Sequence, residues 1–148
     1  MTRPGRVLGV DPGTTRIGLA VSDPDRLVAT PHSTVAGGRG AAQRVKAVHD
    51  DLGCVAVVVG LPRSLAGRKT GSTQMAEALA DQLRQVGAVV HLHDERLTSV
   101  QADRVLRASG KTTRQTKGYK DQVAASVLLQ SWLDSRPPTT PTSEPPPP

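Results

Sequence analysis

Two strand-forming runs near the start of the chain are separated by only six residues. Arg6 to Val10 and Ile17 to Ser22 are rich in Val, Leu and Ile, a composition that favours β-strands. The segment Asp11 to Arg16 joins them, whereas a parallel crossover needs about a dozen residues. The two strands are therefore expected to form an antiparallel hairpin, so the chain does not begin with a strand-helix-strand unit.

After the hairpin the sequence alternates between strand and helix patterns. The spacing of apolar residues and the positions of caps and glycines predict three more strands and four helices. The strands are Leu27–His32, Val55–Val59 and Val89–Leu92, and the helices cover Ala42–Leu52, Ser72 or Thr73 to Val86, Thr98–Ser109 and Asp121–Ser135. The last three strands should run parallel, with right-handed crossovers. The predicted fold class is α/β, a mixed five-stranded sheet whose first two or three strands are antiparallel, flanked by helices.

The predicted topology brings acidic residues to one edge of the sheet. If the first strand lies beside Val55–Val59 and runs in the same direction, the carboxyl ends of three strands share that edge. Asp11, residues 60–62, and Asp94 with Glu95 come just past those ends. Ligands of open α/β sheets bind outside carboxyl ends where the strand order reverses. The functional site is therefore expected at this edge.

Each acidic segment also has a structural interpretation. Asp11 can form an Asx-turn, Asp94 and Glu95 can be a solvated strand end, and Asp121 in the first turn of its helix can interact with the helix dipole. Strand alternation alone does not choose between Asp94 and Glu95. If the fold brings the segments together, the carboxylates can hold Mg²⁺, and two ions about 4 Å apart can assist phosphodiester displacement.

The charge balance indicates a polyanionic partner. The chain has 19 Lys and Arg against 13 Asp and Glu, a net charge of +6. Six of the cations lie between Arg104 and Lys120, where no acid occurs, although a solvated flexible loop explains this segment equally well. With one Tyr, one Trp and no Phe, the chain has few side chains on which bases can stack. Nucleic-acid contacts should therefore involve mainly phosphates.

Several other classes of protein are disfavoured. The 60–70 segment lacks the spacing of an ATP-binding P-loop, and the His91 and His93 pair has no further zinc ligands near it in sequence. No apolar run approaches the ~18 residues that span a membrane, and Cys54 is the single cysteine, so a cytoplasmic protein is expected. Seven of residues 137–148 are proline, which predicts a folded domain at 1–136 and a disordered tail at 137–148.

Four motifs together resemble the YqgF (RuvX) family of Holliday junction resolvases, also described as pre-16S rRNA nucleases. They are Gly9–Asp23, Val59–Pro62 with Gly71, Asp94–Ser99 and Lys120–Ala125, and the resemblance covers essentially the whole chain before the tail. The resemblance implies a ribonuclease H-like fold. It also implies that Asp11, Glu95 and Asp121 are the catalytic, metal-binding carboxylates, with Mg²⁺ or Mn²⁺ as cofactor.

The expected function is that of a metal-dependent endonuclease acting on structured RNA, at the 5′ end of pre-16S rRNA during ribosome biogenesis. The alternatives are a Holliday junction resolvase, which needs a dimer, and a non-catalytic RNA-binding module for ribosome assembly. Expected partners are structured RNA or DNA junctions and ribosome precursor particles, with the chain a monomer or weak homodimer. The expected substrate-binding residues are Thr14, Arg16, Arg63, Lys69, Arg96, Lys111, Arg114 and Lys117.

Overall fold

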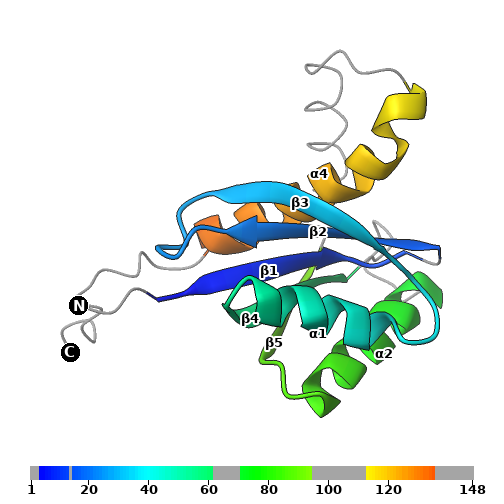
Figure 1. Cartoon of the computed structure of the whole chain (residues 1–148), viewed down its shortest axis with the longest axis horizontal. Coiled ribbons are helices and arrows are strands. Elements are labelled where there is room, and N and C mark those ends of the chain that lie inside the picture. The colour runs from blue at the N-terminus through cyan, green and yellow to red at the C-terminus, as the bar shows by residue number, and fades with distance from the viewer. Residues whose placement is uncertain (1–3, 14, 62–70, 95–112, 136–148) are drawn as a thin grey trace.

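A five-stranded sheet forms the centre of the computed structural model (Figure 1). The structure describes residues 4–13, 15–61, 71–94 and 113–135, and for residues 71–72 and 113–118 it describes the backbone alone. The strands are β1 (Arg6–Asp11), β2 (Arg16–Ser22), β3 (Ala29–Ala36), β4 (Cys54–Leu61) and β5 (Val90–Asp94). The helices are α1 (Ala41–Asp51), α2 (Gly71–Gln85) and α4 (Thr113–Ser135). None of the described helices is both long and apolar enough to cross a bilayer.

The sheet has the order β3-β2-β1-β4-β5. The β1–β2 and β2–β3 pairs are antiparallel, and the β1–β4 and β4–β5 pairs are parallel. The predicted hairpin and the predicted place of the first strand beside the fourth are both confirmed. β1, β4 and β5 therefore end at the same edge of the sheet, where Asp11, Leu61 and Asp94 are their last residues.

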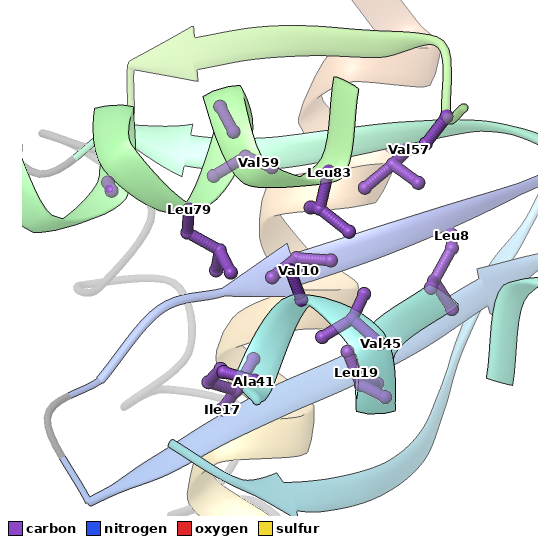
Figure 2. Close-up of a cluster of buried hydrophobic side chains, with 14 of the residues drawn as sticks. Leu8, Val10, Ile17, Leu19, Ala41, Val45, Val57, Val59, Leu79 and Leu83 are labelled. Carbon is purple, nitrogen blue, oxygen red and sulfur yellow. The ribbon is translucent and has the colours of Figure 1, made fainter. Parts of the chain in front are cut away.

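Helices cover both faces of the sheet. On one face, side chains from β1, β2 and β4 pack against α1 and α2, and Figure 2 shows Leu8, Val10 and Val59 of the strands beside Val45 and Leu83 of the helices. On the other face, a smaller cluster joins the sheet to α4 through Leu129 and Trp132. Successive residues from Ala56 to Val59 alternate between the two clusters, which is why this part of β4 is apolar without interruption.

The third strand begins two residues later than predicted and extends to Ala36. The carboxylate of Asp23 accepts hydrogen bonds from the backbone amides of Leu27 and Val28, at 2.7 and 2.9 Å. Leu27 and Val28 lie between β2 and β3, and they are 68% and 58% exposed. The Asp23 carboxylate thus takes the amides of Leu27 and Val28, and strand pairing with β2 starts at Ala29, opposite Ser22.

The last helix begins at Thr113, whereas the sequence predicted a start at Asp121. The helix continues through Gly118, since a single glycine costs only about 1 kcal/mol in a helix. Asp121 is therefore not in the first turn, so its alternative interpretation as a partner of the helix dipole is wrong. Residues 113–120, which are part of the basic segment Arg104–Lys120, are therefore helical rather than a loop. The helix predicted at 98–109 and the tail at 137–148 lie outside the described residues and stay predictions.

Two glycines let α4 lie directly against the sheet. A Cβ atom at Gly9 of β1 would lie 2.8 Å from the Cβ of Leu129, and a Cβ at Gly18 of β2 would overlap the backbone carbonyl of Asp121. Glycine within a strand commonly marks such a close approach of another backbone.

We predict that Gly18→Ala destabilises the protein by at least about 1–3 kcal/mol, because a backbone carbonyl cannot rotate away from the new methyl group. Urea unfolding at equilibrium measures this change. Gly53→Ala is the control: its methyl group meets no atom within 4 Å, and only its left-handed φ of 70° opposes the change. A Gly18→Ala variant as stable as the wild type would show that α4 does not pack this tightly.

The lone cysteine gives a second test of the packing. Burial raises the pKa of the Cys54 thiol to about 11, and Cys54 is 8% exposed. At pH 8 only about 0.1% of such a thiol is ionised, so alkylation should be slow in the native protein and fast in denaturant. Equally rapid alkylation in both conditions would mean that the start of β4 is open to solvent.

Candidate metal and nucleic-acid site

Two acidic residues come to the same corner of the molecule, where β1 ends beneath α4. Asp11 pairs with Gly18 across the β1–β2 hairpin, and pleating places it on the α4 face, because Val7 packs there with Trp132. The backbone of Asp121 lies directly over Gly18. The fold thus brings Asp11 and Asp121 to one corner of the molecule, at the sheet edge where the sequence predicted a site.

Arg16 forms an ion pair with Asp121 at this corner. The Arg16 Nε–H donates to Oδ2 of Asp121 at 2.9 Å, and the two side chains are 37% and 29% exposed. Pairs this accessible to water contribute about 1 kcal/mol or less. The sequence predicted that Arg16 binds substrate, and it gave no sign of this carboxylate partner.

A second contact fixes α4 over the outer strands. The Gln122 side-chain amide donates to Oγ1 of Thr34 at 3.3 Å. Thr34 is the β3 partner of Gly18, so Asp11, Gly18 and Thr34 form one row across three strands. Sequence reasoning missed Thr34 and Gln122. The one available signal was Gly18 itself, a glycine among the apolar residues from Ile17 to Val21.

The structure separates Asp94 from the other two acids. Asp94 is in register with Leu61, whose side chain packs in the core beneath α1 and α2. His93, one residue earlier, contacts Ser131 of α4 through Nε2 at 3.0 Å. Pleating therefore places Asp94 on the face opposite Asp11, which argues against Asp94 as a partner of Asp11 and Asp121.

The two histidines of β5 have structural contacts. The ring of His91 lies 5.1 Å from that of Trp132, and burial lowers the pKa of His93.

Among the described residues, no group of three His, Cys, Asp or Glu side chains is arranged to hold a metal. The two carboxylates Asp11 and Asp121 suit Mg²⁺ or Mn²⁺, which commonly take one or two carboxylates and complete their shells with water and substrate phosphate.

The remaining predicted site residues are not described with side chains. Arg114 and Lys117 lie on the first turns of α4, which Figure 1 shows extending past the sheet. Outside the described residues are Thr14, Arg63, Lys69, Glu95, Arg96 and Lys111.

Comparison with known proteins identifies close relatives. The family model RuvX, described as Holliday junction resolvase, matches residues 5–135. A protein of Mycolicibacterium paratuberculosis named "Putative pre-16S rRNA nuclease" is 50% identical over 136 residues, covering 89% of this chain and 81% of its own length. One with the same name from Leifsonia xyli is 46% identical over 147 residues, covering 94% and 95%.

Solved structures share the fold at low identity. Thermus thermophilus RuvC in complex with a Holliday junction has a TM-score of 0.56 at 18% identity, covering 90% of this chain and 99% of that one. The fowlpox virus resolvase bound to junction DNA has a TM-score of 0.54 at 13% identity, covering 88% and 97%. These likenesses confirm the ribonuclease H-like class of fold. Given the family match over residues 5–135 and relatives at about half identity, the chain belongs to the RuvX family, described as Holliday junction resolvases.

Proposed function

We propose that this protein is a divalent-metal-dependent endonuclease that hydrolyses phosphodiester bonds in structured RNA, and that it processes the 5′ end of pre-16S rRNA in the cytoplasm. The observation that carries the proposal is the placement of Asp11 and Asp121 at one corner, at the carboxyl end of β1. The relatives named as pre-16S rRNA nucleases support the choice of RNA.

Asp11 and Asp121 would hold the cation, with Glu95 as a third carboxylate. We choose Glu95 over its neighbour because pleating turns Asp94 toward α1 and α2. A bound Mg²⁺ or Mn²⁺ supplies Lewis-acid stabilisation of the charge that develops on the phosphate oxygens. Arg16 and the basic start of α4 would hold the substrate backbone, and the net charge of +6 favours its approach.

A DNA junction is the second candidate substrate, and the description of the family model favours it. The chemistry of phosphodiester hydrolysis is the same for both substrates, but resolving a junction needs two sites and therefore a symmetric dimer. An assay of the full chain with a pre-16S rRNA fragment and a four-way DNA junction, in Mg²⁺, in Mn²⁺ and in chelator, distinguishes them. The RNA should be cleaved at one position, only with metal. Cleavage of the junction alone would support the resolvase.

Asp11→Asn should lower the cleavage rate more than about 100-fold, a loss of about 2.7 kcal/mol of transition-state stabilisation. Asparagine keeps the size and turn-forming capacity of Asp11 but removes its charge, so the variant should fold and bind RNA as the wild type does. The matched control is Asp81→Asn, which neutralises an exposed carboxylate on α2. A near-normal rate for Asp11→Asn would instead favour a non-catalytic RNA-binding protein.

The first turns of α4 and the basic residue Lys111 that precedes them in sequence should contribute to affinity rather than to chemistry. Replacing Lys111, Arg114 and Lys117 together by Ala should reduce the log–log salt dependence of RNA binding by about two if all three contact single-stranded phosphates. The control replaces three cations elsewhere, Arg39, Lys46 and Arg84. The same slope in the wild type and the α4 variant would show that this segment does not contact RNA.

A further inference from the structure

The Arg16–Asp121 ion pair occupies a carboxylate that the proposed function assigns to a cation. Nε of Arg16 lies 2.9 Å from Oδ2 of Asp121. A Mg²⁺ ion holds its oxygen ligands at about 2.0–2.1 Å and in a fixed octahedral arrangement. A guanidinium bound to the same carboxylate takes up space that the cation and its ligands need, and its positive charge repels the cation.

The position of α4 does not depend on this ion pair. Leu129 and Trp132 pack in the cluster that joins the helix to the sheet. The Gln122–Thr34 contact fixes the helix near the site. Further along the helix, the side-chain oxygen of Gln130 accepts a hydrogen bond from the backbone amide of Ala29, at 2.8 Å. Arg16 can therefore leave Asp121 without releasing the helix.

Arg16 is also suited to a second partner. Its side chain is 37% exposed at the corner that holds Asp11 and Asp121, where a substrate phosphate must sit for cleavage. The guanidinium is planar, always charged and able to donate two parallel hydrogen bonds to phosphate oxygens.

We infer that Arg16 is a positioning residue that exchanges partners: it pairs with Asp121 in the metal-free protein and turns to a backbone phosphate of the nucleic acid when a divalent cation takes that carboxylate. The inference rests on the proposed function, because it needs both the cation and the substrate. Metal binding and phosphate binding then strengthen each other, since each favours the state in which Arg16 has left Asp121. The exchange delays assembly of a phosphate-binding site until the metal is present.

Calorimetric titration of the full chain with Mn²⁺, without nucleic acid, is the first test. Arg16→Gln removes the competing charge and should tighten Mn²⁺ binding by up to about fivefold. Arg16→Lys keeps the charge and should stay near the wild-type affinity. Arg84→Gln is the matched control, because it removes an exposed Arg–Asp pair from α2.

The second test follows the Arg16 side chain in the wild-type protein, and Arg16→Lys serves only to assign its resonance. The Nε–Hε resonance of Arg16, assigned by its absence in Arg16→Lys, should shift when Mg²⁺ is added, as the bond to Asp121 is lost. The third test measures affinity for RNA with and without Ca²⁺, used as a cation that does not promote cleavage. The gain in affinity with Ca²⁺ should be smaller in Arg16→Gln than in the wild type.

Unchanged or weaker Mn²⁺ binding in Arg16→Gln would overturn the inference, because Arg16 would then only hold Asp121 in place. An Nε–Hε resonance that does not move at saturating Mg²⁺ would overturn it as well, while leaving the proposed nuclease intact. If the wild type binds neither Mn²⁺ nor Mg²⁺, the proposed function fails and the inference fails with it.

Discussion

The close contact between α4 and the β1–β2 hairpin is the constraint on which the site depends. Side chains at Gly9 and Gly18 would push the helix away from the sheet, and the overlap at Gly18 falls on the backbone of Asp121. Without this contact Asp121 could not lie beside Asp11 or pair with Arg16. The same two glycines that allow dense packing therefore also assemble the candidate site.

Other interactions of α4 support this placement along its length. Trp132 and Leu129 bury apolar area against the sheet, while Gln122 and Gln130 bond to β3. Apolar burial of this kind gives most of the free energy of packing, and the polar contacts fix the register of the helix. Because Asp121 is on α4 while Asp11 and Arg16 are on β1 and β2, the site is built on rigid elements.

The sheet topology was predictable because few alternatives existed. Six residues between two strands permit only a hairpin, and the strand-helix pattern that follows determines the directions of the other strands. The start of α4 was not predictable, since the tolerance of a helix for Gly118 depends on its surroundings. The pair formed by Arg16 and Asp121 joins residues 105 apart in sequence, and no local pattern indicates such a contact. The face of the sheet on which Asp94 lies relative to α4 could not be read from the sequence, because strand alternation does not say which face a helix covers.

The central claim is that Asp11 and Asp121 together hold a divalent cation, and paramagnetic broadening by Mn²⁺ tests it most directly. In spectra of the ¹⁵N-labelled full chain, substoichiometric Mn²⁺ should broaden the backbone amides of Asp11, Gly18 and Asp121 first. The amides of Gly53 and Gly87, which precede β4 and β5 at the opposite edge of the sheet, should stay sharp. Uniform broadening, or broadening centred away from Gly18, would contradict the claim.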